Sequence, residues 1–270
     1  MRFTLLLVFT FLFASNYFAF HPIWTFMDKR LIKDIANLDL NNPKKVESYF
    51  KKHNKRISKE KLGFSWEVWS TGKAAGTISI QADFYYFNDS LVSYKIYPEL
   101  PDEKERINRY RKWYGTQFND NEGEFSPFEY NCEAIYSPLD AYHQSFREVL
   151  LSEKSRKYMS PESGIMYGYA GGYSGGILPN RKAFLELKKD SLTVDQVTCL
   201  MYAKNPISRF TAMEWYLQNR TSFSDTILLD KWIELNLKEI PTCFTLTGCL
   251  GRNESSELLL YLYSQMKLED

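Results

Sequence analysis

The sequence predicts an α+β fold in which N-terminal helices and an antiparallel meander sheet are followed by an all-α C-terminal domain. Two patterns predict it. Apolar and polar residues alternate between residues 64 and 96, as in strands with one buried face, and apolar residues recur at helical spacing from Ser191 onward. With 270 residues, of which 44% are hydrophobic and 25% charged, the chain has globular composition and enough length for one or two cores.

The first twenty residues are the most apolar part of the chain. Met1 and Arg2 give a positive start, and residues 3–20 carry no charge. This pattern is typical of a signal peptide or an N-terminal membrane anchor, and it assigns residues 1–20 to such a segment. We therefore expect the bulk of the protein in the periplasm or outside the cell, or anchored to the membrane by residues 3–20. Cleavage stays open, since neither Ala14 nor Ala19 has a small residue two positions earlier.

Residues 21–135 are expected to form an α+β domain. Helical spacing of apolar residues predicts two short helices near residues 31–38 and 46–50, on either side of Pro43. Alternation then predicts three strands at residues 64–68, 78–86 and 92–96. Their connections are short and contain Gly or Asn-Asp, so neighbouring strands should pair antiparallel as a meander.

A basic segment lies between these helices and the strands. Residues 44–61 carry eight Lys or Arg against two Glu. A solvated helix end and loop explains them best, because aromatic side chains that stack on bases are not interleaved with them. Contact with an anionic membrane surface is the other interpretation. Nucleic acid is not expected as a partner, since the net charge of the whole chain is only +1.

Residues 136–190 are expected to form a helix and a connector rich in Gly and Tyr. The helix should start at Ser137 with an apolar face that continues to Leu150, and His143 should pack beside that face. Five glycines between residues 168 and 176 predict a hinge or a surface loop. The loop would expose three candidate binding residues: Tyr167, Tyr169 and Tyr173.

No motif in the sequence has both the residues and the spacing or chain order that catalysis, metal binding or cofactor binding requires. Residues 172–176 match the Gly-x-Ser-x-Gly pattern around Ser174, but all three His precede that Ser, whereas the hydrolases that use this turn place their His after it. The Cys spacing is not that of a zinc site, and no phosphate-binding loop is present. We expect no metal and no cofactor. Cys243 and Cys249 form either a disulfide or two inert buried thiols.

Residues 191–270 should be helical. Thr193 with Gln196 is a capping box, and Asn205 with Pro206 starts a second helix after almost no loop. Two later helices are expected after residues 222–224 and after Ser255, separated by a non-helical insertion at residues 242–251.

The first helical pair resembles a HEAT-like repeat, whose second helix opens with Asp-Pro-x-x-Arg. Asn205, Pro206, Arg209 and Ala212 match this pattern, with Asn in place of Asp. The resemblance implies a surface that binds proteins, with Arg209 and Trp215 as candidate binding residues. It covers about thirty residues, whereas a solenoid needs at least three such units.

These observations predict an exported or membrane-anchored, non-catalytic binding or scaffolding protein of unknown ligand. Its C-terminal domain would bind a protein partner. The alternative is a hydrolase of the cell envelope that uses carboxylates such as Glu129, Glu133 or Asp140, because pairs of Asp and Glu need no visible motif.

Overall fold

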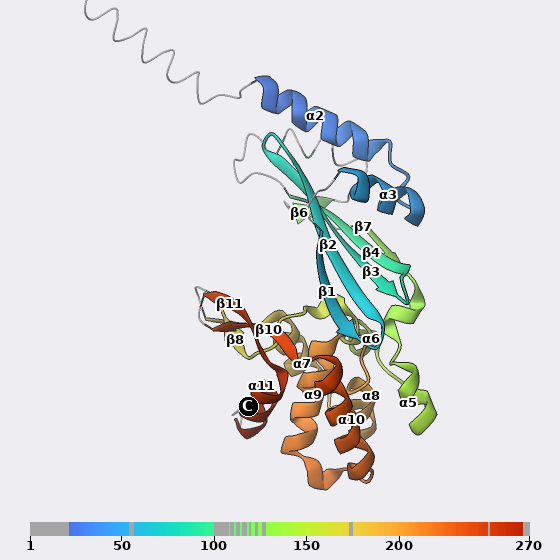
Figure 1. Cartoon of the computed structure of the whole chain (residues 1–270), viewed down its shortest axis with the longest axis vertical. Coiled ribbons are helices and arrows are strands. Elements are labelled where there is room, and N and C mark those ends of the chain that lie inside the picture. The colour runs from blue at the N-terminus through green and yellow to red at the C-terminus, as the bar shows by residue number, and fades with distance from the viewer. Residues whose placement is uncertain are drawn as a thin grey trace, which may run out of the picture. The chain divides into compact units, whose positions relative to one another are not determined.

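The computed structural model describes residues 22–53, 57–99, 108, 111, 114, 118, 120–121, 124–125, 128–172, 175–247 and 249–266 (Figure 1). The predictions for the leader at residues 1–20 and for Tyr173 and Ser174 fall outside these residues. The α+β prediction is confirmed, since a helix pair and a five-stranded antiparallel sheet are followed by helices. Of the described residues, no helix is both long and apolar enough to cross a membrane.

The described residues form two compact units. The first takes the residues up to 59, 69–85 and 93–130, and the second takes 60–68, 86–92 and 131 onward. The first part of the chain contains α2 (Pro22–Ala36), α3 (Pro43–His53), β1 (Ser58–Gly63), β2 (Trp66–Ala75), β3 (Ile78–Phe87), β4 (Ser90–Glu99), β5 (Asp120–Asn121), β6 (Glu124–Phe125) and β7 (Phe128–Asn131).

The sheet has the strand order β1-β2-β3-β4-β7. The three predicted strands correspond to β2, β3 and β4, and β3 shows the expected alternation, with Ile78, Ile80 and Ala82 buried between half-buried polar residues. Sequence reasoning missed β1, which falls in the basic segment and has only Leu62 and Gly63 buried. Lysines and glutamate in β1 hid the strand pattern.

Two connections in the sheet have left-handed backbone at both residues. Phe64 and Ser65 have φ of 52° and 65°, and Asn88 and Asp89 have φ of 47° and 60°. Two-residue turns of this hand match the right-handed twist of paired strands. Asn and Asp tolerate this backbone, whereas for Phe64 it is strained and must be held by its surroundings.

The core of the first unit joins the helix pair to the sheet. Leu31, Ile35, Val46 and Phe50 are buried, as the helical spacing predicted, and the Phe50 ring lies 5.6 Å from that of Phe84 on β3. Much of the high aromatic content therefore serves core packing in this unit.

The second part of the chain is mostly helical. It contains η1 (Glu133–Tyr136), α5 (Asp140–Ser145), α6 (Glu153–Met159), η2 (Pro161–Ser163), β8 (Ala170–Gly171), β9 (Gly176–Ile177), α7 (Pro179–Lys189), α8 (Val194–Leu200), α9 (Pro206–Gln218), η3 (Arg220–Ser222), α10 (Thr226–Glu239), β10 (Thr242–Thr247), β11 (Leu250–Ser255) and α11 (Ser256–Gln265). Helix α9 is central, since α6, α7, α8 and α11 all contact it. Residues 206–214 are all buried, as expected of a helix covered on every side.

The helix starts in this unit follow the predicted caps. The Thr193 hydroxyl accepts the backbone N–H of Gln196, whose side chain accepts the N–H of Thr193 in return. The Asn205 side chain accepts the N–H of Ile207 at 3.0 Å, ahead of Pro206 in the first turn of α9. The predicted break at residues 242–251 is confirmed as well, because it belongs to the β10–β11 hairpin.

The helix predicted from Ser137 is confirmed at its start, where α5 begins at Asp140, but its continuation to Leu150 is wrong. Helix α5 ends at Ser145, and Phe146 is extended with φ −131° and ψ 161°. The chain then runs without regular structure to Ser152, which caps α6. The Tyr142 hydroxyl donates to the Arg147 carbonyl at 2.8 Å, which holds the chain in this extended course, and Leu150 is 92% exposed instead of buried.

Candidate functional site

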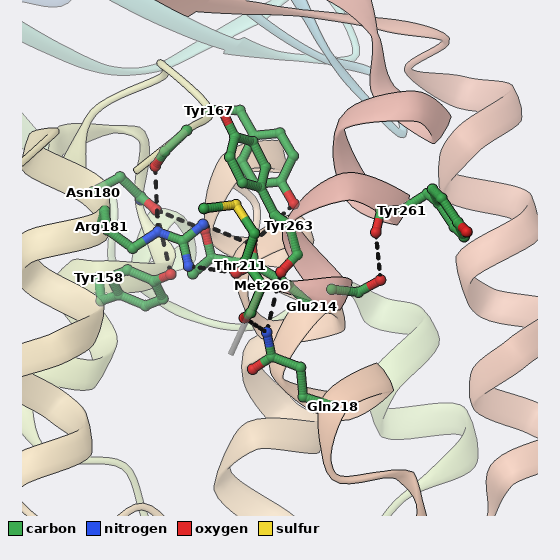
Figure 2. A network of polar contacts seen from close by, with 12 residues as sticks. Tyr158, Tyr167, Asn180, Arg181, Thr211, Glu214, Gln218, Tyr261, Tyr263 and Met266 are labelled. Carbon is green, nitrogen blue, oxygen red and sulfur yellow. Dashed lines mark hydrogen bonds and ion pairs between the residues drawn. The ribbon is translucent and has the colours of Figure 1, made fainter. Parts of the chain in front are cut away.

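A buried ion pair lies at the centre of the second unit. Arg181 on α7 donates from both terminal nitrogens to the Glu214 carboxylate on α9, at 2.7 and 2.6 Å, and both side chains are almost fully buried (Figure 2). The Tyr167 hydroxyl donates to the same carboxylate at 3.1 Å, and Arg181 Nε donates to the Gly168 carbonyl at 3.2 Å. Burial and the Glu214 charge raise the pKa of Tyr167 well above its usual range.

A second set of polar side chains surrounds Asn180. Its amide nitrogen donates to the hydroxyls of Ser163 at 2.9 Å and Ser208 at 2.8 Å, and its oxygen accepts from Tyr158 and Thr211 at 3.3 Å each. Figure 2 shows Tyr158, Asn180 and Thr211 near the ion pair of Arg181 and Glu214. The network satisfies its own buried groups, so we assign it a structural role: it fixes the loop at residues 163–168 and α7 on α9.

The predicted binding residues are less exposed than a binding surface requires. Tyr167 is completely buried, which corrects the expectation that its ring is exposed. Tyr169 is half-buried, with its ring 5.9 Å from the Arg181 guanidinium. Trp215 is half-buried and its ring meets that of Phe223 edge-on at 5.8 Å. Among the predicted binding residues that the structure describes, Tyr169 and Trp215 keep surface that a partner can contact.

Arg209 is also fully buried, which argues against contact with a partner. Its guanidinium donates to the carbonyls of Ala203 and Leu62, both at 2.8 Å, and lies 5.1 Å from the centre of the Phe64 ring. Phe64 in turn stacks on Trp232 at 4.9 Å, and its N–H donates to Glu239 at 3.2 Å. These contacts hold Phe64 in its strained turn.

Three adjoining cavities open in the second unit where the predicted helix fails. Their volumes are about 410, 630 and 430 Å³, which is the range of ligand pockets. The first and second share Tyr142, Glu148 and Val149, and the second and third share Tyr136, Leu151 and Arg156. We call this continuous feature, formed around residues 136–157, the α5–α6 groove.

The irregular segment at residues 147–151 lines the first two cavities of this groove. No backbone N–H of these five residues donates a hydrogen bond to another described part of the chain. Two of its carbonyls accept from side chains, that of Arg147 from Tyr142 and that of Leu150 from Gln196 at 3.4 Å. The segment therefore shares one property with an exposed strand edge: its backbone donors are unpaired among the described residues, and its residues line two cavities.

Several polar groups of the groove are paired or are poor nucleophiles. Glu133 pairs with Arg156, and Glu153 pairs with Lys157 at 3.0 Å. Burial raises the pKa of the Cys199 thiol to about 12, so this Cys is protonated at neutral pH. His143 lines the 630 Å³ cavity but is exposed, which corrects the expectation that it packs.

Lys204 contacts the end of η1 beside this cavity. Its ammonium donates to the Ala134 carbonyl and, at 2.7 Å, to the Ser137 hydroxyl, and Ser137 itself donates to the Ala134 carbonyl at 2.9 Å. Burial lowers the pKa of Lys204 to about 8. Because the Ser137 proton points to a carbonyl and not to Lys204, this pair stabilises a helix end and does not activate a nucleophile.

The carboxylates named for a hydrolase are placed as solvated or ion-paired groups. Glu129 lies 3.6 Å from Lys95, and Asp140 is exposed in the first turn of α5. Among the described residues, no group of three His, Cys, Asp or Glu could hold a metal ion.

Cys249 and the basic segment each differ from the prediction in one respect. Cys243 is buried on β10 opposite Glu254, and Cys249 is exposed at the turn; both are free thiols, as are Cys132 and Cys199. In the basic segment, the ammonium groups of Lys51 and Lys59 lie 4.7 and 3.6 Å from the Trp69 ring. An aromatic side chain from β2 is therefore placed between its lysines, which sequence reasoning did not foresee.

Comparisons with protein families, curated proteins and solved structures found no match for this chain. The HEAT-like resemblance of residues 193–216 therefore stays a resemblance of sequence. What the fold and the groove define together is an α+β protein in which an irregular segment lines adjoining cavities.

Proposed function

We propose that this protein is a binding protein whose α5–α6 groove takes an extended segment of a partner polypeptide. One observation carries the proposal: the backbone N–H groups of residues 147–151 are unpaired among the described residues and lie beside the cavities. An added strand would supply carbonyl acceptors for these donors, and its alternate side chains would enter the cavities that residues 147–151 line.

The lining of the groove supports a peptide partner. Phe146, Val149 and Val194 offer apolar surface, while Arg147, Glu148 and Asp195 offer charges of both signs. Mixed linings of this kind suit a polypeptide, whose backbone gives affinity and whose side chains give specificity. The exposed Leu150 side chain adds apolar contact area at the edge of the groove.

Selection from a displayed library of random peptides of about 12 residues tests the proposal on the purified full-length protein. Peptides enriched on the protein should bind the variant Val149→Pro at least about tenfold more weakly, because proline removes one N–H donor from the edge. Val149→Ala, which keeps the N–H, should lose much less. Ile227→Ser removes an exposed apolar side chain on α10 and is the control for non-specific apolar contact.

Two results would overturn the proposal. One is that enriched peptides bind Val149→Pro and the unchanged protein equally. The other is that photo-crosslinking places them away from residues 136–157. An ester or peptide substrate that the protein turns over would instead favour the hydrolase alternative.

A further inference from the structure

Helix α2 starts with four large apolar side chains in solvent. Ile23 is 58%, Trp24 49%, Phe26 66% and Met27 43% exposed. Single exposed apolar residues are ordinary, but four of them within the first six residues of one helix make an apolar patch. We call these four residues the α2 apolar turn.

The rest of α2 fixes which side of the helix faces the protein. Asp28 is buried, and its carboxylate accepts the N–H of Thr77 at 2.9 Å and the hydroxyl of Thr77 at 2.7 Å. At about 100° per residue, Phe26, Arg30 and Lys33 lie on the opposite face of the helix. In Figure 1, α2 lies along one end of the first unit's strands, where Thr77 is part of the β2–β3 turn.

Along α2, basic residues come after the exposed apolar residues. The α2 apolar turn comes directly after the uncharged residues 3–20, and three exposed cations follow it, Lys29, Arg30 and Lys33. Sequences with this order occur where a chain leaves a bilayer, with aromatic residues at the interface and basic residues at the lipid phosphates.

A second copy of the chain suits this surface less well than a membrane does. A symmetric dimer with the two α2 helices parallel would bring Arg30 and Lys33 close to the same residues of the partner copy. Like charges at such a contact repel, whereas anionic headgroups attract these cations over about a Debye length.

We propose that the first turns of α2 lie in the interfacial layer of a lipid bilayer. Ile23, Phe26 and Met27 would enter the boundary of the acyl chains, and Arg30 and Lys33 would meet anionic headgroups. The inference is independent of the peptide groove, and it assigns membrane contact to the helix that precedes residues 44–61, for which such contact was the alternative interpretation.

Fluorescence quenching by brominated lipids in vesicles tests this placement with the full-length chain. Because residues 3–20 are expected to attach every variant, the readout is the depth of α2 and not binding itself. Phe26→Trp adds an emission that bromine on the acyl chains should quench by about half or more. Leu262→Trp, at a similarly exposed apolar position on α11, is the matched reporter, and its added emission should not be quenched. Both added emissions are read as differences from the unchanged protein, because its six Trp, Trp24 among them, emit in every variant.

A charge variant separates headgroup contact from apolar insertion. Arg30→Glu/Lys33→Glu in the Phe26→Trp background should lower the quenching in vesicles that contain about 30% phosphatidylglycerol, and much less in pure phosphatidylcholine. Lys182→Glu/Lys189→Glu, on exposed positions of α7, is the control. Flotation of the vesicles shows that each variant remains attached.

Two outcomes would overturn the placement. If the added emission is quenched by acrylamide in water and not by brominated lipid, α2 lies in solvent. If neither quencher reaches it, another protein surface covers the α2 apolar turn, and a concentration-dependent mass in detergent would identify a second copy.

Discussion

Arg181 and Glu214 form a two-pronged ion pair with N–O distances of 2.7 and 2.6 Å, and their side chains are only 2% and 3% exposed. Removal of one partner leaves a buried charge without compensation. We therefore expect Arg181→Met or Glu214→Gln to lower the free energy of unfolding by about 3–5 kcal/mol in urea denaturation.

The double variant Arg181→Met/Glu214→Leu should lose much less than the two single losses together, since no charge is left buried. The exposed pair of Lys154 and Asp190 is the matched control, and Lys154→Met should cost no more than about 1 kcal/mol. Single-variant losses at Arg181 or Glu214 as small as this control would contradict a structural role for the network.

The lowered pKa of Lys204 predicts that the free energy of unfolding rises with pH. Its folded pKa of about 8 lies below its ordinary 10.5, so the unfolded chain binds more protons between these values. The free energy of unfolding of the protein, relative to that of Lys204→Met, should therefore increase by about 2 kcal/mol from pH 8 to pH 9.5. The cysteine and tyrosine titrations are shared and cancel in this difference. Lys182→Met, at an exposed position, is the control, and curves for Lys204→Met that stay parallel to those of the unchanged protein would refute the assignment.

Gly63 is expected to resist substitution for two reasons. Its φ is +78°, and an added Cβ would lie 3.2 Å from both Arg209 Nη2 and Ile240. Gly172 has a similar φ of +81° but nothing within 4 Å of its would-be Cβ. Thermal unfolding should show that Gly172→Ala costs about 1–2 kcal/mol for backbone strain, and that Gly63→Ala costs at least about 1 kcal/mol more for crowding. Equal losses would mean that Arg209 and Ile240 move aside freely.

The four thiols should differ sharply in reactivity. Cys132 and Cys249 are exposed, whereas burial raises the pKa of Cys199 to about 12 and that of Cys243 to about 11. Iodoacetamide at about pH 7.5 should modify the two exposed cysteines in the native protein and all four after unfolding, as mass spectrometry can follow. If Cys249 reacts only after reduction, it is held in a disulfide, contrary to the structure.

The sequence predicts the elements of this fold better than it predicts the groove. Alternation predicts β2, β3 and β4, and capping chemistry predicts the starts of α8 and α9, because both signals are local. The Arg181–Glu214 pair left no signal, since its partners are 33 positions apart and look like surface residues in sequence. The burial of Tyr167 was not predicted either, because its partner Glu214 is distant in sequence and the neighbouring glycines indicated a surface loop.

The groove is the clearest case of a local signal overridden by tertiary contacts. Helical spacing is present at Leu139, Tyr142, Phe146, Val149 and Leu150. In the structure, however, the Tyr142 hydroxyl donates to the Arg147 carbonyl, and Tyr142 lies beside Cys199 of α8. No single-sequence pattern reports such contacts. Conflict between local propensity and the final fold is expected where a binding site lies.

The connections at residues 64–65, 76–77 and 88–89 are only two residues long, so they fix which residues of neighbouring strands pair and which face each side chain takes. Because side chains alternate between faces, one added residue within a paired strand would shift its register and turn inward-facing side chains such as Ile80 or Phe84 outward. Insertions are therefore expected to be excluded from the sheet but tolerated in the unpaired segment at residues 147–151. Under the proposed function, a change in the length of the groove segment would alter the choice of partner while the sheet stays unchanged.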